Sequence, residues 1–202
     1  MILAAAHAFR KFVLFLAVAM GIGIFAVTES RYPSGGKTHE LIEWFGIVLI
    51  VACILGRTWA SLYIGGRKND EMVTIGPYSI MRNPLYFFSI LGAIGVGAQL
   101  GSVALALIFG ALACAVFFIV VLHEEKLLLR QYGGSYRVYL SKVPRLLPKP
   151  SLWRDTPILA IRPPRVLMTF ADALMFLLAV PLAELFEALQ QAGIIPILLV
   201  LP

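Results

Sequence analysis

Long apolar runs separated by short charged segments limit this chain to folds that a lipid bilayer can hold. The clearest runs cover about residues 41–63, 84–100 and 103–122. At 1.5 Å of rise per residue, helices of roughly 17 to 20 residues extend about 26–30 Å, which crosses the hydrocarbon core. A segment in lipid must satisfy its own backbone groups, so each run is predicted to be a transmembrane helix.

Two further apolar runs lie toward the ends of the chain. The first, from about residue 12 to 27, is interpreted as a retained helix because no small-x-small cleavage site follows it. The other covers about residues 166–189 and contains Pro181, and the tail 194–201 is too short to span and is expected to be re-entrant or interfacial. We therefore predict an all-α integral membrane protein with about five transmembrane helices.

Composition agrees with a membrane protein and argues against other classes. Of the 202 residues, 60% are hydrophobic and only 14% are charged, whereas soluble domains have about a quarter charged residues. The net charge is +6, but the basic residues lie between apolar runs without forming a block, so no nucleic-acid partner is expected. Cys53 and Cys114 are isolated within apolar runs and form neither a disulfide framework nor a zinc-binding spacing.

The positions of the basic residues predict the topology. Of the 17 Lys and Arg residues, all but Arg31 and Lys37 fall in three places. These are the N-terminal tail, the segment between the second and third spans together with Arg57, and the segment between the fourth and fifth spans. The positive-inside rule places these segments and the N-terminus in the cytoplasm, in a bacterial inner membrane or the endoplasmic reticulum. The tight turn between spans three and four then makes residues 76–86 and 123–148 neighbours on the cytoplasmic face.

The first of these stretches contains a helix start with a cation beside it. Asn83 is a strong N-cap, and Pro84 is favoured at the first helical position. Backbone N–H groups at such a start suit an anion, and Arg82 adds a guanidinium that can hold a carboxylate with two hydrogen bonds. A capped helix beside a topology-setting arginine is the alternative interpretation.

The second stretch begins with two carboxylates where the fourth span ends. Glu124 and Glu125 lie where desolvation and the helix dipole both disfavour negative charge, which predicts a cationic partner such as Arg82, a loop residue or a bound sulfonium. An interfacial salt bridge is the alternative. No metal is expected, because His123 lacks the second histidine of an H-E-x-x-H motif.

Tyrosines at helical spacing follow these carboxylates. Tyr132, Tyr136 and Tyr139 predict an amphipathic helix at the membrane interface. Aromatic faces can hold an adenine ring or a sulfonium, although tyrosine is also common at membrane interfaces without any ligand.

Together the two stretches resemble the isoprenylcysteine carboxyl methyltransferase family and its phospholipid methyltransferase relatives. The first family motif, G-P-Y-x-x-x-R-H-P-x-Y, is matched by Gly76, Pro77, Tyr78, Arg82, Pro84 and Tyr86. The second is matched by Glu124, Glu125, Leu128, Tyr132, Gly133, Tyr136, Tyr139, Val143, Pro144 and Pro148. The resemblance covers about residues 65–150 and departs from the family at Asn83, where a histidine is usual.

The resemblance implies an enzyme that uses S-adenosylmethionine. The residues it implies for cofactor binding are Tyr78, Asn83, Pro84, Tyr86, Glu124, Glu125, Tyr136, Tyr139 and Pro148. Glu124 and Glu125 would bind the hydroxyl or ammonium groups of the cofactor. Arg82, Glu125 and Arg145 are the expected catalytic residues, with the two arginines orienting an acceptor carboxylate or phosphate.

The expected acceptor is lipophilic and enters from the bilayer, with carboxylate O-methylation as the first expectation. Alternatives are a phospholipid N-methyltransferase, an NADPH enzyme of the sterol-reductase type, and a non-catalytic lipid-binding protein, which the change at Asn83 makes conceivable. The expected organisation is two N-terminal helices in residues 1–66, a methyltransferase core in 67–150, and a C-terminal loop with a spanning or re-entrant segment in 151–202.

Overall fold

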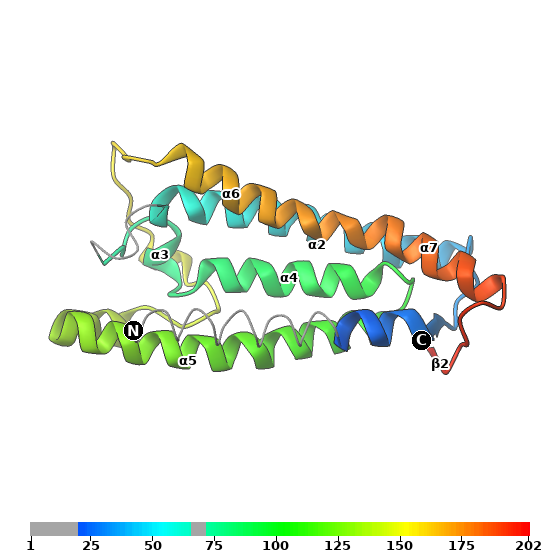
Figure 1. Cartoon of the computed structure of the whole chain (residues 1–202). Coiled ribbons are helices and arrows are strands. Elements are labelled where there is room, and N and C mark those ends of the chain that lie inside the picture. The colour runs from blue at the N-terminus through cyan, green and yellow to red at the C-terminus, as the bar shows by residue number, and fades with distance from the viewer. Residues whose placement is uncertain (1–19, 66–71) are drawn as a thin grey trace. The chain divides into compact units, whose positions relative to one another are not determined.

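A computed structural model of the chain describes residues 20–65 and 72–202 (Figure 1). Residues 20–27 are helical, and the remainder of the predicted first span lies outside the described residues. The elements that follow are β1 (Thr28–Ser30), α2 (Lys37–Ile64), α3 (Pro77–Ile80), α4 (Pro84–Ala98), α5 (Val103–Lys142), the 3-10 helix η1 (Pro150–Leu152), α6 (Pro163–Leu174), the 3-10 helix η2 (Met175–Leu178), α7 (Ala179–Gln191) and β2 (Leu199–Leu201).

Three helical stretches of the described chain are long and apolar enough to cross a membrane. They are α2, α5 and the continuous stretch Pro163–Gln191, whereas α4 is apolar but has only 15 residues. The predicted helices near residues 41–63, 84–100 and 103–122 are therefore confirmed as helices. The count of five spans stays a prediction.

Helix α5 extends well past the predicted end of its span near residue 122. It continues to Lys142, with non-helical backbone angles only at Gly133 (φ 53°, ψ −122°). The segment after the apolar run is rich in Glu, Lys, Leu, Arg and Gln, which favour helix, so charge alone does not end it. The predicted tyrosine-bearing helix is thus a continuation of the span beyond a bend at Gly133.

The all-α prediction is wrong at the tail. Residues Leu199–Leu201 form a strand that pairs in parallel with Thr28–Ser30, with Thr28 opposite Leu199. Backbone N–H groups outside the strands continue the ladder, from Leu198 to the Val27 carbonyl (2.9 Å) and from Arg31 to the Leu201 carbonyl (2.7 Å). This pairing satisfies backbone hydrogen-bonding groups of the segment after Pro196.

The described chain divides into two compact units. The first contains residues 20–52, 90–120 and 175–202, with a core formed by Phe25, Leu100, Leu105 and Ala183. Within it the α2 and α4 backbones approach closely, because a Cβ on Gly95 would lie 2.6 Å from the Gly46 carbonyl oxygen. Glycine at positions 46 and 95 therefore allows the two helices to pack closely.

The second unit contains residues 53–65, 72–89 and 121–174. One of its apolar clusters includes Ala60, Tyr63 and Tyr78, and another includes Tyr136, Tyr139 and Val143. Loop residues after η1 join the first cluster, since Trp153 stacks on Trp59 with ring centroids 5.8 Å apart and Asp155 accepts a hydrogen bond from Tyr63 Oη. Each unit draws on segments distant in sequence, and the division into residues 1–66, 67–150 and 151–202 stays a prediction.

Candidate functional site

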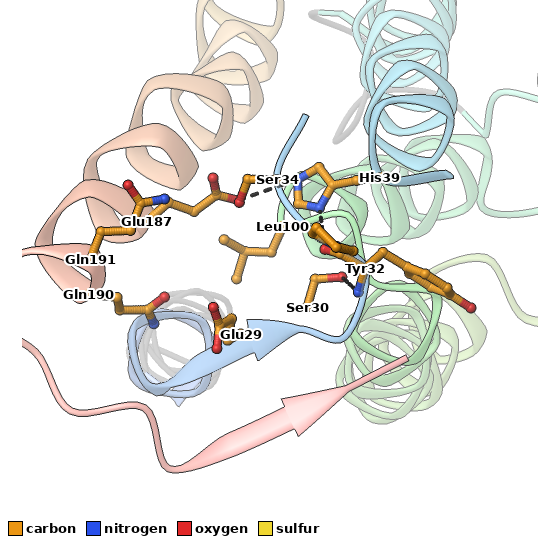
Figure 2. A pocket seen from close by; sticks show the side chains of 10 residues that line it. Glu29, Ser30, Tyr32, Ser34, His39, Leu100, Glu187, Gln190 and Gln191 are labelled. Carbon is orange, nitrogen blue, oxygen red and sulfur yellow. Dashed lines mark hydrogen bonds and ion pairs between the residues drawn. The ribbon is translucent and has the colours of Figure 1, made fainter. Parts of the chain in front are cut away.

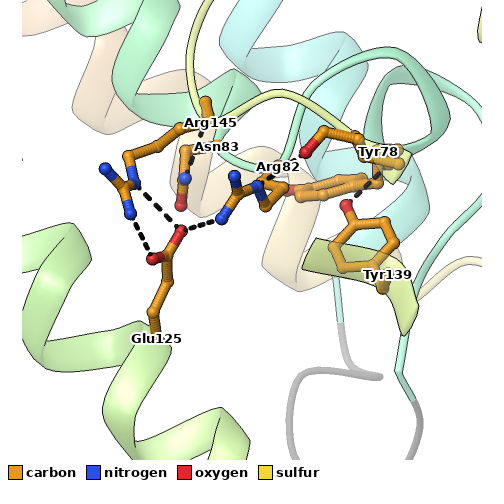
Figure 3. A network of polar contacts seen from close by, with 7 residues as sticks. Tyr78, Arg82, Asn83, Glu125, Tyr139 and Arg145 are labelled. Carbon is orange, nitrogen blue, oxygen red and sulfur yellow. Dashed lines mark hydrogen bonds and ion pairs between the residues drawn. The ribbon is translucent and has the colours of Figure 1, made fainter. Parts of the chain in front are cut away.

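Two arginines and one glutamate form the centre of the candidate site in the second unit (Figure 3). Arg82 Nη1 donates to Glu125 Oε1 at 2.7 Å, and Arg145 Nη2 donates to Glu125 Oε2 at 2.8 Å. Arg145 Nε also donates to Glu125 Oε1 at 3.2 Å, so this second guanidinium grips the carboxylate with two nitrogens. The cationic partner predicted for the paired glutamates is confirmed for Glu125.

The cluster is largely shielded from solvent. The Glu125 side chain is 9% exposed, that of Arg82 14% and that of Arg145 33%. The hydrogen bonds to Glu125 raise the pKa of Arg145 above its ordinary value. Two guanidinium groups meet at this carboxylate, and guanidinium groups are suited to bind an anionic group of a ligand.

Backbone carbonyls of the loop after α5 fix the segment around Arg82. Arg82 Nε donates to the Val143 carbonyl at 2.7 Å, and the Arg82 N–H donates to the Pro144 carbonyl at 2.9 Å. Asn83 Nδ2 donates to the Arg145 carbonyl at 3.1 Å. The predicted proximity of residues 76–86 and 123–148 is therefore confirmed, and Asn83 contributes through its side-chain amide to the connection between them.

Two tyrosines join α3 to the end of α5. Tyr139 Oη donates to the Tyr78 carbonyl at 2.7 Å, and both residues are buried. Burial also raises the pKa of the Tyr78 hydroxyl well above its ordinary value. The buried Tyr78 and Tyr132 hydroxyls have no hydrogen-bond partner among the described residues, which leaves polar capacity available to a ligand.

The other predicted site residues occupy different environments in the same unit. Pro84 is buried at the first position of α4, and Tyr86 and Glu124 are half-buried on α4 and α5. Tyr136 is 3% exposed and packs in the cluster that contains Tyr139. Pro148 is exposed, and the neighbouring Lys149 N–H donates to the Ile80 carbonyl at 2.9 Å.

Sequence reasoning missed the residues that hold the turn beginning at Gly76 and Pro77 in place. The Ser79 hydroxyl donates to the Gly76 carbonyl at 2.6 Å and accepts from the Arg154 N–H at 3.0 Å. The Gly76 N–H donates to the Arg154 carbonyl at 2.7 Å, so both backbone groups of Arg154 are hydrogen-bonded to this turn. A serine inside an otherwise apolar turn was the available signal, but its partner lies too far along the sequence to be inferred.

The helices and this charged cluster together define a membrane protein with a buried polar site formed by two sequence motifs. A family model described as phospholipid methyltransferase matches residues 41–135. The chain belongs to this family of membrane methyltransferases, which includes the isoprenylcysteine type.

Several known proteins resemble the chain over much of its length. It is 32% identical to the cobalt-zinc-cadmium resistance protein CzcN of Cupriavidus metallidurans over 83% of the chain and 76% of that protein. It is 33% identical to the nickel-cobalt-cadmium resistance protein NccN of Alcaligenes xylosoxydans over 78% of the chain and 73% of that protein. It is 27% identical to protein-S-isoprenylcysteine O-methyltransferase B of Arabidopsis thaliana over 65% of the chain and 73% of that protein. No solved structure matches the chain.

Proposed function

We propose that the protein is an S-adenosylmethionine-dependent methyltransferase that acts on a lipophilic acceptor, with methylation of a carboxylate oxygen as the favoured reaction. The observation that carries this proposal is the cluster of Arg82 and Arg145 on Glu125, because guanidinium groups can bind the carboxylate or phosphate of an anionic reactant. The family supports methyl transfer, and the isoprenylcysteine O-methyltransferase relative supports transfer to oxygen.

The residues around the cluster suit a polar cofactor. The buried hydroxyls of Tyr78 and Tyr132 lack hydrogen-bond partners among the described residues and would gain them from ribose or amino-acid groups. We assign the cofactor to the residues that the family motifs supply, namely Tyr78, Asn83, Pro84, Tyr86, Glu124, Glu125, Tyr136, Tyr139 and Pro148. Of these, Glu124 and Glu125 are assigned to the ammonium or hydroxyl groups of the cofactor, and Glu125 also accepts three hydrogen bonds from guanidinium nitrogens.

When bound, the cofactor would supply a methyl group on a sulfonium, and its transfer would form a carbon–oxygen bond while the carbon–sulfur bond breaks and S-adenosylhomocysteine leaves. An ionised acceptor carboxylate has no proton to lose. The side chains therefore need to bind and orient, and none has to act as a general base. Arg82 and Arg145 orient the acceptor carboxylate, and Glu125 is a positioning residue that holds both guanidinium groups. Tyr139 keeps the Tyr78 segment in place through the carbonyl it contacts.

A lipophilic acceptor would enter this site from the bilayer, with the site on the cytoplasmic side as the charge distribution predicts. The two candidate acceptor groups are a carboxylate on a prenylated cysteine and an amine on a phospholipid headgroup. They differ in charge, so they would interact differently with Arg82 and Arg145. Two guanidinium groups favour the carboxylate, while a phospholipid could offer its phosphate to the same cations.

The matches to CzcN and NccN favour a second, physiological candidate, namely that methyl transfer contributes to tolerance of cobalt, zinc, nickel or cadmium. A strain lacking the gene would then grow more poorly in these ions. Restoration by the wild-type gene but not by a Tyr78→Phe or Arg82→Lys variant would connect tolerance to the proposed site, and equal growth of all strains would reject this role.

The direct test is calorimetric titration of the purified protein in detergent with S-adenosylmethionine. We expect saturable binding that Tyr78→Phe weakens and that Arg137→Ala, an exposed arginine on the same α5 helix, leaves unchanged. Labelled methyl transfer is then compared between a farnesylated N-acetylcysteine and vesicles of phosphatidylethanolamine. Absence of cofactor binding by folded wild-type protein would reject the methyltransferase, and NADPH binding in its place would support the reductase alternative.

A further inference from the structure

Three potential metal ligands meet in the first unit, apart from the arginine cluster. His39 Nε2 lies 3.2 Å from Glu43 Oε1 and 3.4 Å from Glu187 Oε1. Figure 2 shows Glu187 reaching from α7 toward the His39 ring. The histidine is 3% exposed, while the side chains of Glu43 and Glu187 are 34% and 23% exposed.

The hydrogen bond on the other side of the ring determines what His39 presents to the carboxylates. His39 Nδ1 lies 3.1 Å from the Tyr32 carbonyl oxygen, which can only accept, so Nδ1 carries a proton. In the neutral imidazole, Nε2 then presents a lone pair toward two carboxylate oxygens. Three acceptors facing one another require a cation, either a proton on Nε2 or a metal ion. A ring whose Nδ1–H donates to a backbone carbonyl is the usual arrangement of a metal-binding histidine.

The spacing of the three atoms suits a small divalent ion. Bonds of about 2.0–2.1 Å in tetrahedral geometry place ligand atoms about 3.3–3.4 Å apart, whereas octahedral neighbours would be about 2.9 Å apart. The two contacts of His39 Nε2 agree with the tetrahedral value, and all three ligand atoms lie within 4.8 Å of one another. An imidazole with two carboxylates favours a late transition ion over magnesium or calcium, which prefer oxygen ligands alone.

The His39 ring packs closely against Gly101 and adjoins a pocket. Gly101 has a φ of 61°, and a Cβ there would lie 2.2 Å from His39 Nδ1, so this glycine allows the ring its position. A pocket lined by Glu29, Tyr32, Glu187 and Gln190, among others, adjoins the histidine (Figure 2). Within residues 20–65 and 72–202, no Lys or Arg pairs with Glu43 or Glu187, and Glu184 adds further negative charge near Glu43.

We propose that His39, Glu43 and Glu187 bind a divalent transition-metal ion, with Zn²⁺ as the best fit, and that the adjoining pocket supplies the fourth coordination position. Nothing in this proposal depends on methyl transfer, since the three ligands belong to the first unit and the arginine cluster to the second.

The test uses full-length protein purified without a polyhistidine tag and stripped with a chelator. Zn²⁺ is titrated by calorimetry, and Co²⁺ is added separately because its visible absorption distinguishes tetrahedral from octahedral coordination. The variants are Glu43→Gln and Glu187→Gln, which keep the side-chain shape, with Glu40→Gln as the control because Glu40 is an exposed carboxylate on the same α2 helix.

We expect one Zn²⁺ per chain, a tetrahedral Co²⁺ spectrum and an increase in melting temperature with metal. Each ligand variant should weaken Zn²⁺ binding by at least the roughly 10- to 100-fold that loss of an outer-shell partner costs, and Glu40→Gln should leave it unchanged. Folding of the variants is checked from their melting temperature without metal. Absence of binding by folded wild-type protein, or binding by folded Glu43→Gln and Glu187→Gln equal to that of wild type, would overturn the site.

Discussion

Arg82 and Arg145 donate to the same carboxylate, that of Glu125, although the α4–α5 hairpin separates them in sequence. Arg82 comes from the motif before α4 and Arg145 from the loop after α5. The charge that holds these segments together is therefore also the charge expected to meet a ligand, which couples the stability of the second unit to its chemistry.

Removal of the shared carboxylate should destabilise the protein strongly. Glu125→Ala leaves two guanidinium groups, one of them only 14% exposed, without their counter-charge. Breaking a buried ion pair in this way costs about 3–5 kcal/mol. We expect a large fall in melting temperature in detergent, against little change for Glu40→Ala at an exposed position. Equal melting temperatures for the two variants would contradict the cluster.

The two tyrosine hydroxyls of the site should behave differently on removal. Tyr139→Phe deletes a buried hydrogen bond to the Tyr78 carbonyl and should cost about 1–3 kcal/mol. Tyr78→Phe deletes a hydroxyl without a partner in the described chain and should leave stability nearly unchanged while weakening cofactor binding. Chemical denaturation and calorimetric titration of both variants separate the two effects. A larger stability loss for Tyr78→Phe than for Tyr139→Phe would reject this assignment.

Alkaline pH should destabilise the protein through Tyr78. Burial raises its pKa well above the ordinary value of 10.0, so above that pH the unfolded chain releases a proton that the folded chain retains. Stability is unaffected by this group below pH 10 and falls as pH rises above it. Melting temperatures measured from pH 8 to 11 should decline less steeply above pH 10 for Tyr78→Phe than for wild type. Parallel declines would show that Tyr78 ionises equally in both states.

The close contact between Gly101 and His39 predicts an unequal pair of glycine variants. Gly35 and Gly101 both have positive φ (79° and 61°), but a Cβ on Gly35 meets nothing within 4 Å. Gly35→Ala should therefore cost only the backbone term of roughly 1–2 kcal/mol. Gly101→Ala adds a clash with the imidazole and should destabilise more, as measured by thermal unfolding. Similar losses would mean that the ring moves aside without cost.

Cysteine labelling can test whether α5 crosses a bilayer. Cys114 is exposed on this helix, whereas Cys53 is buried. In reconstituted vesicles we expect Cys114 to resist a charged methanethiosulfonate reagent, because such a reagent does not enter the hydrocarbon core. A Ser141→Cys variant near the end of α5, at an exposed position, is the water-accessible control. Rapid reaction of Cys114 with the charged reagent would place this part of the helix in water.

The sequence allowed prediction of the helices and of the neighbourhood of the two motifs, because hydropathy, Asn-Pro capping and a short hairpin turn are local signals. It did not predict which groups would pair. Glu125 was distinguished from Glu124 only by the side of α5 that faces Arg82. The Tyr139 contact with the Tyr78 carbonyl, and the approach of Glu187 to His39, depend on packing between segments far apart in sequence. Strand β2 was missed because its partner lies near the other end of the described chain.

The parallel pairing of β1 with β2 also sets an order of events during synthesis. Residues 28–30 have no strand partner until residues 199–201 have been made. At translation rates of 5–20 residues per second, that interval is on the order of 10 to 30 s. The ribosome must therefore deliver almost the whole described chain to the membrane while β1 stays unpaired. A factor that shields an unpaired strand edge during this interval would act on the assembly rate of the protein and leave its final stability unchanged.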